Sequence, residues 1–540
     1  DELNLFIAIR KRDLSGTLLV KPNNLKFQVN SLDWDEIGYC QGASITVYGN
    51  RSGLWEMMEY LRCPVEIYDR RGKCVWWGYI HDVAVREQAI EVGATLNSMT
   101  NRVAVTYSYV EPGTTQIGTR KTTAWAADTE SITEYGYKEF ISSASGLTTE
   151  AAEQRRDTIL NQHKWPQGVG ANPRGRVRYS GAENSLSATL TCRGWMSTLD
   201  WRYASWSNLT AISYKGTGST EQAIGSASTN TKVFQQFQTA SGRSVRALDV
   251  GLSVKKTGSP ADNLVVELFA LDSSSNPTGS ALASYTLAGS AITTSLVWAT
   301  GDLSAVVYLA SNTLYGFQVR RSGSADGSNY YSVLVDEAKG YTSGAFKVWN
   351  GSAWVDRGTD ADMPFRVGVD NQVETTQQIK DLVYTYGQFI SSTDIESSSG
   401  YYLPSWRDGS RSALKEVEDL LKYGGTNDRN LIARVESDRR LRVYEEEARP
   451  STPNFYLKAD GTILNAAGGM QPDFEPPVGR WIKLAEVIPG RVDITKLIDP
   501  TWQFVSGARW NDSNGTSLQF RGQPAIEDLM RLADDGEIVG

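Results

Sequence analysis

The sequence predicts a mainly β protein with some α-helix, in which small β-barrel domains carry an inserted antiparallel β-sandwich. Short runs of β-branched and aromatic residues alternate with turns from residue 1 to about 110. From residue 214 to 370 the chain becomes rich in Ser, Thr, Gly and Ala, loses helical periodicity, and shows many short strand-like runs. The earlier composition returns at residue 371. A chain of 540 residues is also long enough for several domains.

We therefore divide the chain into three ranges. Residues 1–213 form the first part of a scaffold, with a barrel or curled sheet to about 110, a helix-containing segment and further strands. Residues 214–370 form the sandwich, and residues 371–540 form the second part of the scaffold. Because the two ends of a sandwich often lie close together, such an insertion disturbs its host domain little.

In the first range, "VEIYDRRGKCVWWGYIHDV" (65–83) predicts two strands around a tight turn, in which Gly72 takes a positive φ. Successive side chains of a strand point to opposite faces, so the adjacent Trp76 and Trp77 cannot both fill the same core. His81, at the end of the second strand, is expected to be a hydrogen-bonded rim histidine.

Helices are predicted where apolar residues recur at helical spacing, with caps or breakers at the ends. Their ranges are 53–61, 148–166, 376–390, 410–425 and 523–536. The segment 430–450 is predicted as a strand-turn-strand pair. In the sandwich, strands are expected at 245–256, 263–271, 281–288, 313–322, 329–336, 344–355 and 363–369.

Charge and composition exclude several function classes. A formal net charge of −8 argues against a protein that grips nucleic acid through phosphate contacts. No apolar run approaches the roughly 20 residues of a membrane span, and the opening "DELNLFIAIRKRDLSG" does not read as a signal peptide. Four cysteines without CxxC spacing and two histidines make a structural zinc site improbable, and the thiols are expected to stay free.

No catalytic motif is recognisable, and the chain is not expected to be an enzyme. HExxH, GxSxG and Walker A sequences are absent. Cys192 reads as a core thiol without a nearby histidine. Carboxylates are plentiful, but no feature of the sequence selects two of them as a glycosidase pair.

Aromatic residues are the more informative class, because an exposed ring can stack on the apolar C–H face of a sugar. Trp298 is expected in the core of the sandwich. Candidate carbohydrate-binding residues cluster in its last third, around turns: Tyr330, Tyr331, Tyr341, Trp349, Trp354 and the polar Asn350. The alternative is that alternate members of this set belong to the core.

A calcium ion is the one cofactor that the sequence suggests. Asp360 and Asp362 precede the last strand of the sandwich, and alternating carboxylates in a loop can bind a hard cation. The alternative is a solvated turn, which we favour. No other cofactor is expected.

The segment 65–83 resembles a strand pair of phage tail hub proteins, with Val65, Asp69, Gly72, Gly78 and Ile80 at the matching places beside Trp76 or Trp77. Further segments look like later parts of the same arrangement, namely "AEQRRDTILNQHKWP", "LTCRGWMSTLDWRYAS" and "LKEVEDLLKYGGTNDRNLIARVESDRRLRVYEE". The likeness covers about 1–210 and 371–540. The range 214–370 resembles the jelly-roll modules of bacterial and phage surface proteins, many of which are similar to carbohydrate-binding modules.

The hub resemblance implies a virion protein at the tail tip, made in the host cytoplasm. It implies a ring, typically a homotrimer, that contacts the distal tail protein, the tape measure and fibre or spike proteins, and through whose lumen DNA passes. One tryptophan of the pair 76/77 then fills its own barrel, and the other meets a helix of the same chain or the next subunit. The jelly-roll implies binding of host surface polysaccharide. The alternatives are a distal tail protein with an inserted module, and a glycoside-active enzyme with an ancillary module.

Overall fold

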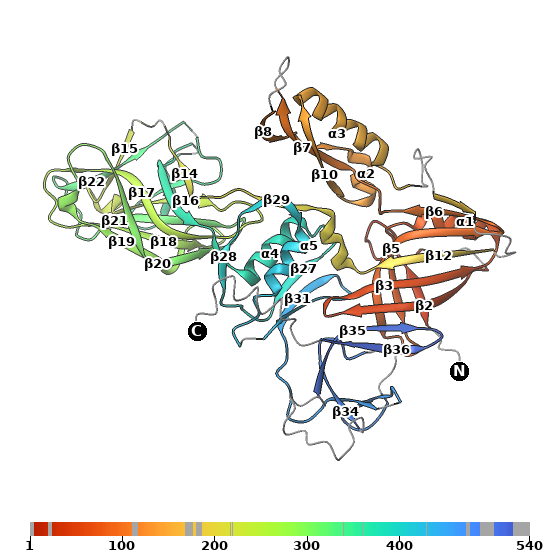
Figure 1. The fold of residues 1–540 in the computed structure, drawn as a ribbon. Helices are drawn as coiled ribbons and strands as arrows, with labels where there is room; N and C mark the ends of the chain where they lie inside the picture. Colours follow the sequence, from red (N-terminus) through yellow and green to blue (C-terminus); the bar gives the residue numbers. More distant parts are fainter. Residues whose placement is uncertain are drawn as a thin grey trace. The chain divides into compact units, whose positions relative to one another are not determined.

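The computed structural model confirms the mainly β class (Figure 1). It describes residues 5–19, 24–110, 117–167, 176–179, 186–216, 218, 220–338, 340–358, 360–427, 429–458, 460–470, 476–485 and 502–521. Within these ranges the chain forms strands β1 to β36 and helices α1 to α5. The helix expected at 523–536 lies outside the described residues.

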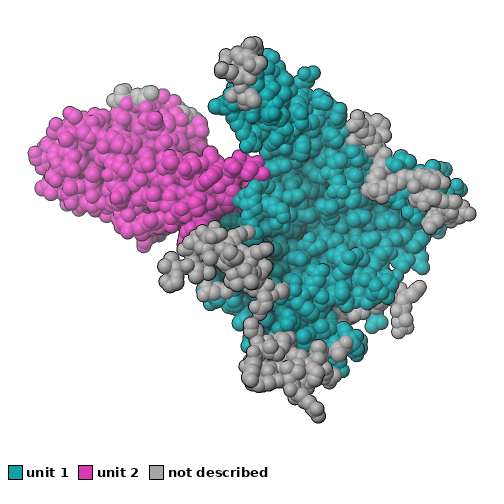
Figure 2. Space-filling model, viewed as in Figure 1, with its two compact units in different colours: residues 1–203, 386–398, 411–540 teal, residues 204–385, 399–410 magenta. Residues whose placement is uncertain are grey.

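The chain divides into two compact units, coloured separately in Figure 2. Unit 1 comprises residues 1–203, 386–398 and 411–540. Unit 2 comprises residues 204–385 and 399–410, and thus contains the whole range 214–370 together with short flanking segments. Segments from both ends of the chain therefore belong to unit 1.

The main sheet of unit 1 has sixteen strands. Its central path runs in the order β1-β4-β5-β12-β3-β2-β35-β34-β32-β33, and the other strands pair along its sides. The strands are β1 (Phe6–Ile9), β2 (Lys26–Asp35), β3 (Ile37–Tyr48), β4 (Pro64–Tyr68), β5 (Cys74–Glu87), β6 (Ile90–Thr95), β11 (Arg176–Tyr179), β12 (Leu186–Arg193), β27 (Ser392–Ile395), β30 (Leu431–Val435), β31 (Arg440–Glu445), β32 (Phe455–Lys458), β33 (Ile463–Asn465), β34 (Trp481–Ala485), β35 (Trp502–Asn511) and β36 (Gly515–Phe520).

Strands from opposite ends of the sequence pair directly in this sheet. β2 pairs antiparallel with β35, with Ser31 opposite Asn511 and Asp35 opposite Gly507. Figure 1 shows the red β2 beside the blue β35. β30 joins the same sheet through a short parallel pairing with β3. The first and last stretches of the chain therefore fold as one body.

The hairpin expected at 65–83 is present as β4 and β5, and Gly72 has a φ of 79° in its turn. Trp76 and Trp77 are both buried within unit 1. Trp77 is covered by β30 of the same chain, because its indole N–H donates to the carbonyl of Val435 at 2.9 Å and its ring lies 5.5 Å from that of Tyr39. The neighbour expected for one ring of this pair is therefore a segment of the same chain, but it is a strand and not a helix, and neither ring is left exposed for an oligomer interface.

A second sheet of unit 1 packs against helices. It contains β7 (Arg102–Val110), β8 (Ile117–Thr122), β9 (Ala126–Ala127) and β10 (Glu139–Leu147). Helix α3 (Thr149–His163) lies along β7 and β10 (Figure 1). Thr148 caps it by accepting a hydrogen bond from the N–H of Ala151, as its predicted cap position requires.

The remaining helices also follow the predicted ranges, apart from one short helix not expected. They are α1 (Arg51–Glu56), α2 (Thr129–Tyr135, not expected), α4 (Thr375–Tyr386) and α5 (Ala413–Leu421). Segments of 3₁₀-helix are η1 (Met57–Tyr60), η2 (Trp195–Trp201), η3 (Ser228–Asn230) and η4 (Gly289–Ala291). α5 buries Val417, Leu420 and Leu421 on one face, which is the stripe that its spacing predicts.

Unit 2 is built around a β-sandwich of two six-stranded antiparallel sheets. The first sheet, here sheet A, contains β14 (Ala211–Tyr214), β15 (Thr220–Ile224), β17 (Val245–Thr257), β20 (Val297–Leu309), β22 (Tyr330–Val335) and β25 (Phe365–Asp370). The second, here sheet B, contains β16 (Lys232–Gln238), β18 (Leu264–Leu271), β19 (Pro277–Leu287), β21 (Leu314–Arg321), β23 (Phe346–Trp349) and β24 (Trp354–Asp356). Short strands flank them: β13 (Tyr203–Trp206), β26 (Gln372–Glu374), β28 (Tyr402–Pro404) and β29 (Arg407–Ser412).

The sandwich has its own hydrophobic core between the inner faces of the two sheets. Val250, Leu252 and Phe365 come from sheet A, and Phe317 and Val319 come from sheet B; all are essentially inaccessible to solvent. Alternate residues of each strand point inward, and the others form two outer faces. These outer faces are where a ligand of the sandwich can bind.

The two ends of the sandwich lie side by side. β14 pairs antiparallel with β25, with Ala211 opposite Gly368. Just beyond this pairing, the side chain of Asn371 accepts a hydrogen bond from the N–H of Leu209 at 3.3 Å and donates one to its carbonyl at 3.0 Å. Adjacent ends of this kind allow the sandwich to interrupt another chain segment with little strain.

Candidate functional site

The outer face of sheet B presents an aromatic corner, which we define as Lys232, Phe234, Trp349 and Trp354. The rings of Trp349 and Trp354 lie opposite each other across β23 and β24, with centroids 5.6 Å apart and planes at 70°. The ring of Phe234, on β16, lies 5.6 Å from that of Trp354. Phe234 is buried, and both tryptophans are partly exposed.

Lys232 places its ammonium group over both tryptophan rings. Its Nζ lies 4.2 Å from the centroid of Trp349 and 5.1 Å from that of Trp354. Burial lowers the pKa of Lys232, Glu267 opposes this effect, and Arg320 adds to it. The aromatic corner therefore places one cation against two indole rings. This cation–π interaction fixes the planes of the rings.

A polar row borders the aromatic corner on the same face. Arg320 donates two hydrogen bonds of 2.9 Å to the carboxylate of Glu267, and Gln318 donates a third of 2.6 Å. Burial is the largest single influence on the pKa of Glu267 and acts to raise it, but the hydrogen bonds from Arg320 and Gln318 and the charges of Arg320 and Lys232 together outweigh burial. The pKa is therefore lowered, and the carboxylate stays ionised. The row thus offers fixed charged groups beside the rings, as recognition of a hydroxylated ligand requires.

The turn between β18 and β19 closes the opposite end of this face. Gln236 donates to the carbonyl of Ser275 at 2.6 Å, and the Nζ of Lys347 lies 2.9 Å from the Asn276 side-chain oxygen. These contacts bury two polar side chains in the middle of the sheet face. The accessible part is therefore the end that carries Trp349 and Trp354.

Of the six sequence-predicted binding residues, the structure brings together only Trp349, Trp354 and the turn residue between them, Asn350. The Oδ1 of Asn350 accepts hydrogen bonds from the N–H groups of Ser352 and Ala353, so this atom holds the turn.

The three tyrosines lie elsewhere. Tyr331 is fully buried in the core, and its hydroxyl donates to the carbonyl of Asp262. Tyr341 packs edge-on against the core residue Phe365 at 5.2 Å, and Tyr330 is half-buried on β22. Because side chains alternate between the two faces along β22, Tyr331 points to the inner face of its sheet and is not available to a sugar.

Trp298 was expected in the core, and this prediction is wrong. It lies on β20 with 49% of its surface exposed, on the outer face of sheet A. Period-two alternation gives the set of residues that share a face, but the neighbouring strands decide which face is buried. The sequence pattern did not identify Lys232, Glu267 and Arg320 as site residues, because strands distant in the sequence bring these three together.

The two candidate calcium ligands, Asp360 and Asp362, do not converge. Asp362 is buried, and its carboxylate accepts hydrogen bonds of 3.2 Å from the side chain of Gln235 and from the N–H of Tyr341. Asp360 is exposed. Among the residues that the structure describes, no group of three or more His, Cys, Asp or Glu could hold a metal ion. Asp362 therefore has a structural role in the sandwich.

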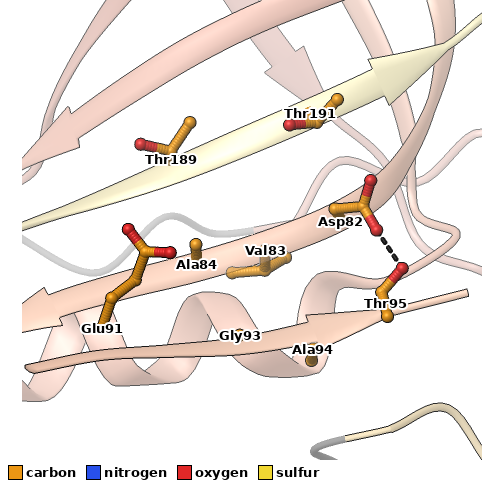
Figure 3. A pocket seen from close by; sticks show the side chains of 9 residues that line it. All are labelled: Asp82, Val83, Ala84, Glu91, Gly93, Ala94, Thr95, Thr189 and Thr191. Carbon is orange, nitrogen blue, oxygen red and sulfur yellow. Dashed lines mark hydrogen bonds between the residues drawn. The ribbon is translucent and has the colours of Figure 1, made fainter. Parts of the chain in front are cut away.

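A shallow pocket of about 220 Å³, with mixed polar and apolar lining, lies on the sheet face formed by β5, β6 and β12 of unit 1 (Figure 3). Asp82 and Glu91 lie toward its two ends, and the Thr95 hydroxyl donates to Asp82. Asp82 lies opposite Thr95 and Glu91 opposite Arg86, so their backbone positions are about 13 Å apart along the strands.

His81 is buried in unit 1, contrary to the expected rim position. Its Nε2 lies 2.8 Å from the amide oxygen of Asn97, so this nitrogen carries the hydrogen, and the buried Nδ1 has no partner among the described residues. Burial lowers the pKa of His81 to about 4; Asn97 and Asp82 act against this shift, and Arg193 and Lys138 add to it.

We expect unit 1 to lose stability as the pH falls from about 6.5 to 4. The unfolded chain binds a proton at His81 near pH 6.5, whereas the folded chain does so only near 4, and the difference is about 3 kcal/mol. Urea unfolding at a series of pH values checks this for the wild type and His81→Asn. The variant should show a smaller decline across this window. Equal declines for both proteins would contradict the assignment.

Comparisons with known proteins add no family. No family model matches the chain, and no curated protein matches it. Among solved structures, the Cry4Aa toxin from Bacillus thuringiensis matches over 62% of this chain and 57% of its own, with 11% identity and a TM-score of 0.16. A mutant VP2 protein of infectious bursal disease virus matches over 65% and 79%, with 9% identity and a TM-score of 0.14. The chain spans little more than half the length of the Cry toxins that it matches.

Proposed function

We propose that the chain is a structural hub protein at the tail tip of a tailed bacteriophage, and that its sandwich binds host surface polysaccharide. In this proposal three copies form a ring that closes the tail tube. The hub-like segments named above lie in unit 1, to which both ends of the chain contribute, except for Ala204 and Ser205 at the end of one segment. The sandwich is the added part, and its adjacent ends suit an insertion.

The aromatic corner is the observation that carries the binding part of the proposal. Two indole rings at 70° form an angled surface on an outer sheet face, with a lysine, an arginine and a glutamate within the same corner or the adjoining row. Stacking needs a fixed ring, and the hydroxyls of a sugar need fixed donors and acceptors. This corner supplies both.

The partners follow from the hub assignment. The ring contacts the distal tail protein and the tape measure above and fibre or spike proteins below, and genomic DNA passes through its lumen. A net charge of −8 suits passage without adhesion, because an acidic wall repels DNA. None of the described helices combines the length and apolar character needed for a bilayer crossing.

We expect replacement of either Trp349 or Trp354 by alanine to weaken polysaccharide binding at least about tenfold, because each removes a stacking surface worth roughly 1.4 kcal/mol or more. Binding of the full-length chain to host cells and to extracted surface polysaccharide measures this. Val355→Ala is the matched control, since Val355 is exposed on the same short strand. Unchanged binding by both tryptophan variants would remove the corner from the proposal.

The hub assignment is tested separately by the state of assembly. Light scattering of the purified chain should give three times its mass of 59.5 kDa, and labelled chain should be found at the tip of assembled tails. Six copies would indicate a distal tail protein instead. Monomers that release sugars from a bacterial polysaccharide would indicate a glycoside-active enzyme.

A further inference from the structure

The outer face of sheet A carries a second aromatic platform, on the side of the sandwich opposite to the aromatic corner. Trp298 lies on β20, where it pairs with Ser253, and its ring extends over the neighbouring Gly251. A Cβ atom at Gly251 would lie 2.9 Å from Cζ2 of the indole. The glycine therefore allows the ring to lie flat on the sheet, with one face covered and the other exposed.

The groups around Trp298 are suited to hydroxyls. Thr300 and Asp302 follow on the same strand and face, and both are exposed. Neither these two side chains nor the indole N–H makes a hydrogen bond or an ion pair within the described part of the chain. On the other side of Gly251 lies Arg366, which is partly exposed and paired with Asp249.

A further aromatic group lies at the far end of the same face. Tyr308, opposite Arg246 on the adjacent strand, is 40% exposed, and the exposed ring of Tyr402 lies 5.1 Å from the Arg246 guanidinium. Gly251 and Arg246 are five residues apart on β17, about 16 Å along the strand. The face thus has an aromatic group at each end and polar side chains between the two. Aromatic groups this far apart can contact different sugar units, so the face fits a chain of sugars better than a single sugar.

Charge indicates which polysaccharide fits. The two arginines of this face are neutralised, since Arg366 pairs with Asp249 and Arg246 pairs with Asp370 at 2.9 Å. Asp302 adds an exposed carboxylate without an ion pair to any described residue. The platform therefore offers acceptors and a slightly negative field, which suits an uncharged sugar and disfavours a polyanion.

We propose that Trp298, with Thr300, Asp302 and Arg366 around it, forms a second binding site for a neutral polysaccharide chain that runs along β17. This site stands apart from the aromatic corner and does not depend on the hub assignment. Two sites on opposite faces would let one sandwich hold two glycan chains, which raises avidity without any new contact.

Affinity electrophoresis of the full-length chain tests the site, with dextran, mannan, galactan and a mixed-linkage β-glucan as neutral probes and polygalacturonate as the anionic one. At least one neutral gel should retard the wild type. Trp298→Ala should weaken that retardation at least about tenfold, and Gly251→Ala should also weaken it because the added methyl group tilts the ring. Leu282→Ala, an exposed residue on β19 of sheet B, is the matched control and should change nothing.

Trp349→Ala separates the two sites. Neutral retardation that survives Trp349→Ala but not Trp298→Ala supports the second site, even where the aromatic corner proves inactive. Retardation that is lost only in Trp349→Ala overturns it and leaves the first site standing. Absence of retardation in all four neutral gels, or preference for polygalacturonate that depends on Trp298, also overturns it. Since Trp298 is exposed, its replacement should leave the melting temperature unchanged, which excludes unfolding as the cause.

Discussion

Replacement of Trp76 by alanine is expected to lower the free energy of unfolding of unit 1 by about 3–5 kcal/mol, the usual cost of truncating a fully buried large aromatic residue. Trp76 has no accessible surface, and its ring reaches over Gly78 of the same strand. Its indole N–H has no hydrogen-bond partner among the described residues, so the loss is one of packing. Typical domains are stable by only about 5–15 kcal/mol, so this variant should be close to unfolding.

Urea denaturation followed by far-ultraviolet circular dichroism measures the loss, and limited proteolysis locates it in unit 1. Trp298→Ala is the matched control, because it removes the same side chain from an exposed position and should change stability by less than about 0.5 kcal/mol. If Trp76→Ala and Trp298→Ala had equal effects, the burial of Trp76 in unit 1 would be refuted.

Replacement of Gly194 by alanine is expected to lower stability by about 3 kcal/mol, through a steric conflict between two backbones. A Cβ atom at this position would lie 1.6 Å from the carbonyl oxygen of Cys40, on the neighbouring strand β3. The N–H of Gly194 donates to the carbonyl of Gln41 at 2.9 Å, so the two segments cannot separate without breaking this contact. The backbone must therefore move, and the pairing of β12 with β3 weakens.

Thermal unfolding compares this variant with Gly327→Ala, where the nearest heavy atom to the added carbon is 3.6 Å away and little change is expected. A soluble Gly194→Ala protein with the wild-type melting temperature would show that β3 and β12 do not approach as closely as described. Gly194 directly follows β12, and this close approach is a physical reason for glycine at this position.

Local patterns in the sequence were sufficient for many elements. The hairpin β4–β5 follows from its turn residues, and α3 and α5 follow from caps and apolar spacing. The assignment of faces was less successful. Trp298 was assigned to the core and is exposed. One of Trp76 and Trp77 was expected against a helix of the same chain or the next subunit, and Trp77 is covered by the strand β30 instead. In both cases a strand distant in the sequence decides the burial, and periodicity carries no information about that strand.

The candidate site shows the same limit. Trp349 and Trp354 are five residues apart and flank one turn, so their proximity could be predicted from the sequence. Lys232, Glu267 and Arg320 join them only through the order β18-β21-β16-β23 in sheet B. Tyr331 was included because it is aromatic and near a turn, yet its inward direction on β22 places it in the core.

The pairing of β2 with β35 has a consequence for biosynthesis. Once the ribosome has made β2, almost the whole chain must still be translated before β35 emerges, which at about 5–20 residues per second takes on the order of a minute. The sandwich, whose two ends meet locally, can complete its folding on the nascent chain. The edge of β2 meanwhile lacks its partner, so neighbouring ribosomes on one messenger RNA hold several such edges close together, and exchange of the last strands between chains competes with correct closure.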